Sequence, residues 1–470
     1  MDLHRQLRYL LGAEAVVDDA GRIAPLLTDH RHLYQGRAAA VVEPADVAAV
    51  SRLLAWCNDT RTPVVPQGGN TGYCGGATPD ESGTAILLSL RRLNRIRAVD
   101  AANFAITAEA GCTLSSVQDA AERVQRLFPL SLGSEGSCQI GGNLATNAGG
   151  TAVLRYGMMR ELTLGIEAVL ADGSVISQLS PLRKDNTGYD LRQLLVGSEG
   201  TLGVITAACL KLFPQARTHA TAWIALPSPS AGIQLLALLR ERSADRLTTC
   251  ELLPRAALQL VLAHIPGARD PGVSDAPWHL MVELGSSGND DVGATLEAAL
   301  EQALSASLAL DASIARSEAQ RENFWRLRES VPEAQRHAGA SLKHDISVPV
   351  GALPRFIEAG AELVERLVPD GLLVAYGHMG DGNLHFNVSQ RAGTDAQTFR
   401  RHEPELRRAI HDLVAGFGGS FSAEHGIGQL KVGELERYAS PAELAAMRRI
   451  KQALDPNNIL NPGKVLRSTS

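Results

Sequence analysis

Residues 67–76 read Gln67-Gly68-Gly69-Asn70-Thr71-Gly72-Tyr73-Cys74-Gly75-Gly76 and follow a short predicted strand at 63–66. Glycine has no Cβ and reaches positive φ, so the backbone N–H groups of such a loop can converge on an anion. A loop of this kind after a strand is suited to a diphosphate. An ordinary tight turn is the alternative interpretation of any single glycine-rich loop.

Two further segments have a similar glycine density. They are residues 133–150, which contain Ile140-Gly141-Gly142-Asn143-Leu144-Ala145-Thr146-Asn147-Ala148-Gly149-Gly150, and residues 197–203. Three such loops between β-rich runs favour a nucleotide site over ordinary turns. The chain has no GxxxxGK(S/T) and no GxGxxG between a strand and a helix, which argues against a phosphate-loop enzyme and a nicotinamide Rossmann domain.

Composition defines the broad class of protein. A chain of 470 residues is too long for one ordinary hydrophobic core, so more than one domain is expected. A hydrophobic fraction of 45% with 20% charged residues is typical of a soluble globular protein. A formal charge of −6 gives no basic surface for nucleic acid. No run approaches the roughly 20 apolar residues of a membrane span.

Cysteine usage and the first residues indicate the compartment. The six cysteines are scattered and form no CxxC pair, which is typical of a reducing compartment. Residues 1–7 lack the apolar core of a secretory signal. We therefore expect a cytoplasmic protein.

The order of predicted elements divides an α+β chain into four parts. Residues 1–36 are expected to be helical and peripheral, and residues 37–215 alternate short strands with helices. Residues 216–420 follow as a second α+β region, and residues 421–470 form a C-terminal segment with a helix at 441–454. Predicted strands are 39–42, 63–66, 85–90, 104–109, 167–170, 175–177, 203–212, 221–226 and 278–284; further helices are 44–56, 231–241 and 294–308.

A predicted hairpin at 376–387 carries the clearest candidate chemistry. It reads Tyr376-Gly377-His378-Met379-Gly380-Asp381-Gly382-Asn383-Leu384-His385-Phe386-Asn387. Asp381-Gly382 is typical of a two-residue turn with positive φ at both positions. That turn would place His378 opposite His385, with Cβ atoms roughly 4.5–5.5 Å apart, and Asn387 on the same face.

Two histidines on one strand face can form part of a metal site. A third ligand could come from Ser422-Ala423-Glu424-His425-Gly426-Ile427-Gly428. Two His and one Glu leave coordination positions open on a divalent ion, as a catalytic site requires. The alternative is a hydrogen-bonded, half-buried histidine pair, and the sequence alone does not show that the two segments meet.

Together with Arg183-Lys184-Asp185-Asn186-Thr187-Gly188-Tyr189-Asp190-Leu191, the three glycine-rich segments resemble the flavin domain of the vanillyl-alcohol oxidase / p-cresol methylhydroxylase (PCMH) family. The resemblance implies a two-part PCMH-type FAD-binding domain, an α+β substrate (cap) domain, and a C-terminal helical segment that returns to the flavin. The first loop lacks the histidine of covalently flavinylated members, so non-covalent FAD is expected. The implied FAD-binding residues are Pro66, Gly68, Gly69, Asn70, Thr71, Gly72, Gly75, Ser137, Gly141, Gly142, Ala145, Thr146, Asn147, Gly149, Glu199, Gly200, Val204, Ile205 and Asn461.

The C-terminal half resembles the FAD-dependent D-2-hydroxyacid dehydrogenases of that family, closest to the D-2-hydroxyglutarate dehydrogenases. The resemblance implies a divalent metal, usually zinc, on His378, His385 and Glu424. It implies His425 as the catalytic base, and substrate contacts from Asn387, Arg328, Lys343 and the two ligand histidines. One departure is Pro332, where the glutarate enzymes carry a threonine, and it weakens the assignment of the second carboxylate pocket.

The implied reaction moves a hydride from substrate C2 to flavin N5 while His425 takes the hydroxyl proton. Arg328 would bind the C1 carboxylate and Lys343 the distal one. Removing Lys343 should then mainly raise KM, whereas His425→Ala should mainly lower turnover.

The chain has no haem, iron–sulfur or nicotinamide motif, so an external electron acceptor is expected. The resemblance implies an electron-transfer flavoprotein or a quinone-linked carrier, and a homodimer is the default assembly. The alternatives are D-lactate or glycolate as substrate, a metal-dependent hydrolase with structural glycine loops, and a non-catalytic flavoprotein that relays electrons.

Overall fold

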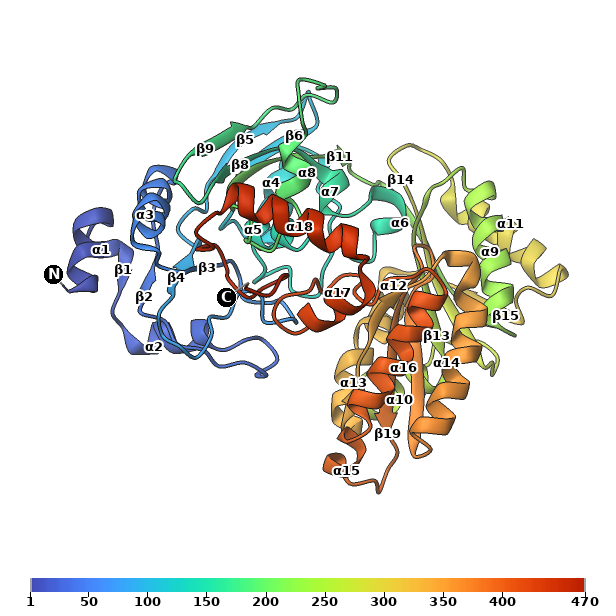
Figure 1. Cartoon of the computed structure of the whole chain (residues 1–470). Helices are drawn as coiled ribbons and strands as arrows, with labels where there is room; N and C mark the ends of the chain where they lie inside the picture. Colours follow the sequence, from blue (N-terminus) through green and yellow to red (C-terminus); the bar gives the residue numbers. More distant parts are fainter. Residues whose placement is uncertain (1, 469–470) are drawn as a thin grey trace. The chain divides into compact units, whose positions relative to one another are not determined.

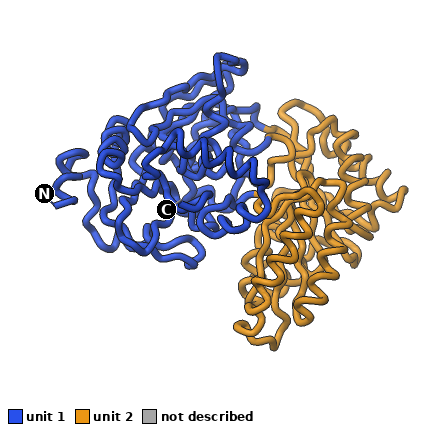
Figure 2. Tube along the Cα trace, in the orientation of Figure 1, with its two compact units in different colours: residues 1–150, 157–215, 424–470 blue, residues 151–156, 216–423 orange. Residues whose placement is uncertain are grey.

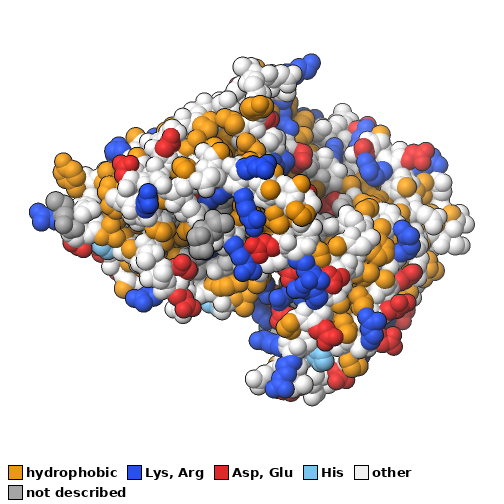
Figure 3. Space-filling view, in the orientation of Figure 1, with side chains coloured by type: hydrophobic (Ala, Val, Ile, Leu, Met, Phe, Trp, Pro, Cys, Tyr) orange, Lys and Arg blue, Asp and Glu red, His pale blue; other side chains and the backbone are white. Residues whose placement is uncertain are grey.

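The structure is a computed structural model that describes residues 2–468, and these residues form two compact units. The first unit comprises the chain up to residue 150, residues 157–215 and the chain from 424 onward, and the second comprises residues 151–156 and 216–423 (Figure 2). No helix in this described part of the chain is long and apolar enough to cross a membrane. On the face drawn in Figure 3, basic and acidic side chains lie interspersed.

The first unit begins with a small sheet of strand order β1-β2-β4-β3, in which β2, β4 and β3 run parallel (Figure 1). Its strands are β1 (Val16–Val17), β2 (Ala40–Val42), β3 (Val64–Gln67) and β4 (Ile86–Ser89). The prediction of a purely helical N-terminal segment is wrong, because β1 pairs antiparallel with β2. The valine pair has a strand preference, and its pairing partners lie far along the chain.

The helix predicted at 44–56 is observed as α3 (Val47–Thr60). Asp46 is its N-cap, and its Oδ1 accepts the Ala49 N–H at 2.7 Å. The helix ends at Arg61, which has a left-handed φ of 54°. The predicted range therefore began three residues too early and ended four residues too early.

The first unit also contains a five-stranded antiparallel sheet of order β5-β6-β10-β8-β9. Its strands are β5 (Ile96–Asp100), β6 (Ala105–Glu109), β8 (Thr163–Val169), β9 (Val175–Gln178) and β10 (Val204–Lys211). The remaining elements are α1 (Leu3–Leu11), α2 (Ala20–Ile23), α4 (Leu114–Glu122), β7 (Arg126–Leu127), α5 (Ile140–Ala145), α7 (Met159–Leu162), α8 (Leu191–Leu195), β11 (Phe213–Pro214), α17 (Val432–Tyr438) and α18 (Pro441–Leu454).

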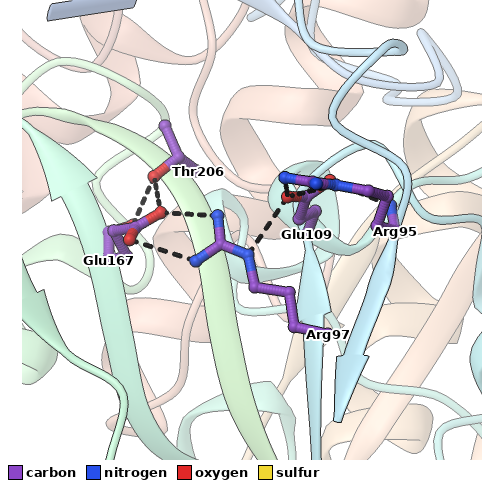
Figure 4. Close-up of polar contacts among 5 residues, drawn as sticks. All are labelled: Arg95, Arg97, Glu109, Glu167 and Thr206. Carbon is purple, nitrogen blue, oxygen red and sulfur yellow. Dashed lines mark hydrogen bonds and ion pairs between the residues drawn. The ribbon is translucent and has the colours of Figure 1, made fainter. Parts of the chain in front are cut away.

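Buried charges cross this antiparallel sheet (Figure 4). Glu109 on β6 is 1% exposed and accepts hydrogen bonds from Arg95 and Arg97. Arg97 also donates to both oxygens of Glu167 on β8, at 3.1 and 2.9 Å. Thr206 on β10 donates to Glu167 at 2.9 Å. The network therefore ties four adjacent strands together through side chains.

The second unit is built on one antiparallel sheet of order β15-β12-β14-β13-β18-β19-β16, with β17 also paired to β19. Its strands are β12 (Thr218–Leu226), β13 (Leu247–Pro254), β14 (Trp278–Ser286), β15 (Asp311–Ile314), β16 (Ser341–Leu342), β17 (Asp345–Ser347), β18 (Gly371–His378) and β19 (Asn383–Gln390). Its helices are α6 (Val153–Tyr156), α9 (Pro229–Arg242), α10 (Arg255–His264), α11 (Val292–Ser305), α12 (Glu318–Glu329), α13 (Val331–Ala338), α14 (Leu353–Leu367), α15 (Ala396–Arg400) and α16 (Glu403–Gly416).

Apolar residues bury both faces of this sheet. One cluster joins alternate strand residues to Leu235 of α9, Leu296 of α11 and Phe356 of α14. The cluster on the opposite face joins Trp223 and Met281 of the sheet to α10, α12 and α13. Successive strand residues point to opposite faces of the sheet. Polar residues that point to the face covered by α10, α12 and α13 therefore lie between the sheet and these helices.

The hairpin β18–β19 forms, but its predicted turn and register are wrong. Its connection has four residues, 379–382, and His385 pairs with Tyr376. Gly382 is the residue of this connection with positive φ, 85°, whereas a primed two-residue turn needs positive φ at both positions. A Cβ on Gly382 would lie 2.1 Å from the Val348 carbonyl oxygen, so a tertiary contact also shapes the turn.

Candidate active site

In the first unit, the glycine-rich loop at 67–76 lies against the segment that leads into α5. A Cβ on Gly69 would lie 2.1 Å from the Ser137 carbonyl oxygen, and a Cβ on Gly68 would lie 3.3 Å from the Gly142 nitrogen. The two backbones approach each other more closely than side chains allow. These two glycines are therefore required by backbone proximity, and their predicted contact with the cofactor stays a prediction.

Several buried polar atoms around these loops have no hydrogen-bond partner in the described chain. They are Gln67 Oε1, Thr78 Oγ1, Gln139 Oε1 and Asn461 Oδ1. Burying such atoms without a partner is costly, so they indicate a polar ligand in contact with the loops. Together with the close backbone approach, these atoms fit a dinucleotide cofactor such as FAD.

The three predicted asparagines stabilise the cofactor loops with their side chains. Asn70 and Asn147 both have positive φ, 55° and 49°. Asn70 Nδ2 donates to the Thr28 carbonyl at 2.8 Å, and Asn147 Oδ1 accepts the Arg160 N–H at 2.9 Å. Asn461 Nδ2 donates to the carbonyls of Gly76 and Glu199, both at 2.8 Å.

Glu199, also predicted to bind the cofactor, has a second role in the structure. Its carboxylate accepts the backbone N–H groups of Ile427 and Gly428, both at 2.7 Å. Burial raises the pKa of Glu199, while these two hydrogen bonds act in the opposite direction. The carboxylate thereby fixes the chain immediately after Glu424 and His425.

The remaining predicted cofactor residues lie on the same segments. Thr71, Gly72 and Gly75 lie in the first loop, Pro66 on β3, Ser137, Gly141, Gly142, Ala145, Thr146 and Gly149 within 133–150, Gly200 before β10, and Val204 and Ile205 at its start. A Cβ on Gly200 would lie 2.6 Å from Pro66 Cγ, so these two segments also touch.

His425, the predicted base, lies beside an aromatic ring of the first glycine loop. The ring centroids of His425 and Tyr73 are 4.6 Å apart. Tyr73 in turn contacts His30 edge to face, at 5.5 Å. Nothing in the sequence indicated that Tyr73 would lie beside His425, or that His30 would contact Tyr73.

In the second unit, the hairpin brings its histidines together on one face despite the shifted register. The ring centroids of His378 and His385 are 5.6 Å apart, and Tyr376 lies 5.0 Å from His385. His378 and His385 are diagonal neighbours across the strand pair, a relation that still allows side-chain contact. The predicted pairing of imidazoles is therefore observed through a different register.

Glu251 of β13 is the central buried charge of this face. Its side chain is 0% exposed. Its Oε1 lies 2.6 Å from His378 Nδ1, and its Oε2 accepts the Arg328 Nε–H at 2.5 Å. Burial alone would raise the pKa of Glu251, but Arg328 and His378 outweigh it and hold the pKa at about 2. Glu251 is thus an anion at neutral pH.

Arg328 is buried, 6% exposed, and belongs to the face of α12 that packs on the sheet. Two turns earlier on α12, Arg321 donates to both oxygens of Glu283 on β14, at 2.8 and 3.1 Å. Trp325 Nε1 donates to the same carboxylate at 3.0 Å. Two buried sheet carboxylates therefore bind one helix face and fix the position of Arg328.

The predicted metal ligands lie close together. Ligand atoms of His378, His385 and Glu424 are all within 4.8 Å of one another. The residue before Glu424, Ala423, donates its N–H to the Asp345 carbonyl at 3.4 Å, and Asp345 pairs with His385 across β17 and β19. Nitrogen and carboxylate donors in this number fit a divalent ion with open coordination positions.

Lys343 and Asn387 lie around the same strand, β19. Lys343 is exposed in the connection between β16 and β17, and both of these strands pair with β19. Asn387 is buried; its Oδ1 accepts the His344 N–H at 3.3 Å and its Nδ2 donates to Gln335 at 3.0 Å. Asn387 thus links the strand that carries His385 to helix α13.

Sequence reasoning missed Glu251 and Gln335. Gln335 is 0% exposed and holds both Asn387 and Ser389. Glu251 is a single acidic residue in the otherwise uncharged run Leu247–Pro254. A lone charge inside a buried strand needs a partner, and this was the signal that could have identified Glu251.

Comparisons with known proteins define the family. Residues 38–178 match the model of an FAD binding domain, and residues 215–465 match the C-terminal domain of FAD linked oxidases. The chain belongs to the FAD-linked oxidase family and is a flavin-dependent oxidoreductase. The FAD-binding class expected from the glycine-rich loops is therefore confirmed.

Its relatives include several proteins named D-2-hydroxyglutarate dehydrogenase. The mitochondrial protein of Arabidopsis thaliana is 38% identical over 98% of this chain and 80% of its own length. The Bos taurus mitochondrial protein is 38% identical over 96% of this chain and 81% of its own length. A Xanthomonas citri protein is 37% identical over 91% of this chain and 89% of its own length.

Solved structures share the fold at low sequence identity. p-Cresol methylhydroxylase with substrate bound superposes with a TM-score of 0.75 at 16% identity, over 99% of this chain and 96% of that chain. Alkyldihydroxyacetonephosphate synthase superposes with a TM-score of 0.73 at 18% identity, over 97% and 84%. The predicted PCMH-type, α+β fold class is confirmed by these likenesses and by the two family models.

Proposed function

We propose that this protein oxidises a D-2-hydroxyacid, with D-2-hydroxyglutarate, which would yield 2-oxoglutarate, as the first candidate. Relatives with that name match more than nine-tenths of the chain. The observation that carries the proposal is the close group of His378, His385 and Glu424, whose donor atoms suit a divalent ion that binds a hydroxyacid.

When bound, non-covalent FAD supplies the hydride acceptor N5, and a divalent ion, with zinc as our first choice, supplies a Lewis acid for the substrate hydroxyl. His425 accepts the hydroxyl proton on an imidazole nitrogen. Tyr73, at 4.6 Å between ring centroids, restricts the orientation of that imidazole. Glu199 supports the same segment by binding the two N–H groups that follow it.

Substrate carboxylates are assigned to Arg328 and Lys343. Glu251 engages Arg328 Nε at 2.5 Å, so the C1 carboxylate would bind through the other guanidinium nitrogens. Lys343, exposed beside β19, is suited to the distal carboxylate as a flexible point charge. Asn387 would contact the substrate from the buried side of the same strand.

Pro332 favours a second candidate substrate. It occupies the first turn of α13 and has no hydroxyl group to donate to a distal carboxylate. D-lactate or glycolate, which lack that carboxylate, would not need such a donor. We rank them after D-2-hydroxyglutarate because Lys343 would then have no anionic partner in the substrate.

We further propose an electron-transfer flavoprotein or a quinone-linked carrier as the acceptor, a homodimer, and the cytoplasm as the compartment. The plant and cattle relatives are named mitochondrial. Direct localisation of this protein therefore tests the proposed compartment.

The test is an anaerobic absorbance spectrum before and after addition of D-2-hydroxyglutarate, with D-lactate, glycolate and the L-isomers in parallel. Bleaching of oxidised-flavin bands by D-2-hydroxyglutarate alone is the expected result. Bleaching by D-lactate or glycolate alone would transfer the proposal to the second candidates. Intact flavin bands with every hydroxyacid would refute the proposed oxidation and favour an electron relay.

A further inference from the structure

Glu251 joins two residues that would otherwise have separate roles. Its two oxygens bind different partners, His378 Nδ1 at 2.6 Å and Arg328 Nε at 2.5 Å. These partners lie 127 and 77 residues away in the chain. All three side chains are less than one-tenth exposed, so water does not compete for the hydrogen bonds.

The geometry fixes which nitrogen of His378 carries a proton. Arg328 donates to Oε2 of Glu251, and a carboxylate paired with a guanidinium accepts hydrogen bonds on its other oxygen as well, so His378 Nδ1 donates to Oε1. The lone pair of the neutral ring is then on Nε2, the nitrogen left for a metal ion. Metal-binding histidines commonly donate their second nitrogen to a carboxylate, which fixes the ring and raises its basicity.

We infer that Glu251 is a positioning residue that holds His378 in the Nδ1–H tautomer and presents Nε2 to the divalent ion. Arg328 provides the countercharge that makes a buried carboxylate tolerable at this position. Arg328 also lies over the Tyr376 ring, 5.0 Å from its centroid, and Tyr376 contacts His385. This inference rests on the metal site of the proposed function.

The same sheet contains a matched carboxylate for comparison. Glu283 on β14 is 5% exposed and, like Glu251, binds an arginine of α12. In the described chain its hydrogen bonds come from Thr221, Arg321 and Trp325, and none of these is a predicted metal ligand. Glu283 therefore supports α12 in the way Glu251 does, without contact to His378.

The experiment compares Glu251→Gln with Glu283→Gln in the flavin-loaded protein. Each protein is stripped with a chelator, and its zinc affinity is measured by competition with a chromophoric chelator. The lost charge and altered hydrogen bond at position 251 should weaken zinc binding by about 10- to 100-fold. Glu283→Gln should change zinc affinity by less than about threefold, although it also removes a buried carboxylate.

Glu251→Asp covers the case in which Glu251→Gln does not fold. It keeps the negative charge for Arg328 but withdraws the carboxylate from His378 Nδ1 by one methylene, and zinc binding should again weaken. Native zinc affinity in folded Glu251→Gln or Glu251→Asp would overturn the inference. Equal weakening in Glu283→Gln would also overturn it, because the effect would then be a general response of α12.

This outcome is separable from the fate of the proposed oxidation. If the native protein binds no zinc or other divalent ion, the inference fails, while flavin bleaching by a hydroxyacid still tests the reaction. If zinc binds and responds to Glu251→Gln but no hydroxyacid bleaches the flavin, the positioning role stands and the proposed substrate is wrong.

Discussion

The two units build their candidate sites from different parts of the chain. In the first unit the backbone forms the site. A Cβ on Gly69 would lie 2.1 Å from a carbonyl oxygen, and buried polar atoms around the loops have no partner in the described chain. In the second unit side chains form it, through His378, His385 and the buried pair of Glu251 with Arg328. A backbone site should fail when a new side chain displaces its loops, and a side-chain site when charge or orientation is lost.

The largest expected effect is the loss of FAD from Gly69→Ala. The new Cβ would overlap the Ser137 carbonyl and force the two cofactor loops apart. The flavin-to-protein absorbance ratio of the purified variant should fall to near zero. Gly136→Ala is the matched control, since a Cβ there meets nothing within 4 Å. Full flavin content in Gly69→Ala would show that the close approach does not shape the site.

The next effect separates turnover from binding. His425→Ala should lower kcat by about 10²- to 10⁴-fold, the usual contribution of a general base, with flavin content unchanged. Lys343→Met should mainly raise KM for a dicarboxylic substrate, because it removes a charge that binds the substrate before and during reaction alike. Steady-state kinetics of both variants measure this division. Equal changes of kcat and KM in the two variants would contradict the assigned roles.

The difference between the units also explains which features were predictable. Glycine density signals a backbone requirement directly, so the loops with close backbone contacts in the FAD-binding domain were identified from the sequence. The hairpin strands were identified too, but a two-residue turn was assumed at Asp381-Gly382, and the contact with the Val348 carbonyl that favours a four-residue connection is tertiary. Local signals thus located the elements and missed the pairing between them.

Side-chain networks were the least predictable part. Glu251 meets its partners across 77 and 127 residues of sequence, and nothing near it in the chain encodes those distances. The strand β1 escaped prediction for a similar reason, since two valines gain strand structure only by pairing with β2. Features that depend on pairing between distant parts of the chain cannot be predicted from a local sequence pattern.

A third prediction contrasts His279 with His378 on the same sheet. His279 is 2% exposed, and neither ring nitrogen has a partner in the described chain, whereas His378 has Glu251. Burial lowers the pKa of His279 to about 4, with Arg255 adding to the shift. The unfolded chain, with a pKa near 6.5, therefore binds the proton first, and stability falls as pH drops from about 6.5 to about 4.

The expected loss over that window is about 3 kcal/mol, from the depression of the His279 pKa. Urea denaturation at several pH values measures it, and His279→Leu should flatten the acid side of the profile. His337→Leu, at an exposed site, is the control and should leave the slope unchanged. An unchanged slope in His279→Leu would assign the acid sensitivity to other groups.

The smallest effect concerns a buried carboxylate–arginine network that contacts no ligand histidine. It tests whether such a pair influences zinc binding only where, as at Glu251, it also binds a ligand histidine. Arg97 is 26% exposed and bridges Glu109 and Glu167, whereas Arg95 is 71% exposed and binds Glu109 alone (Figure 4). Arg97→Met leaves Glu167 with Thr206 and should cost about 2–3 kcal/mol, below the usual 3–5 for a fully buried pair. Arg95→Met should lower stability far less than Arg97→Met, because exposed pairs contribute little.

Both arginine variants should keep native zinc affinity and flavin content in the folded fraction, which distinguishes them from the Glu251 variants. Denaturant titration gives the stability difference, and chelator competition gives the zinc affinity of the same samples. A loss of zinc binding in Arg97→Met would mean that the network in the first unit influences the metal site at a distance. Native zinc affinity would restrict that influence to the carboxylate that touches a ligand histidine.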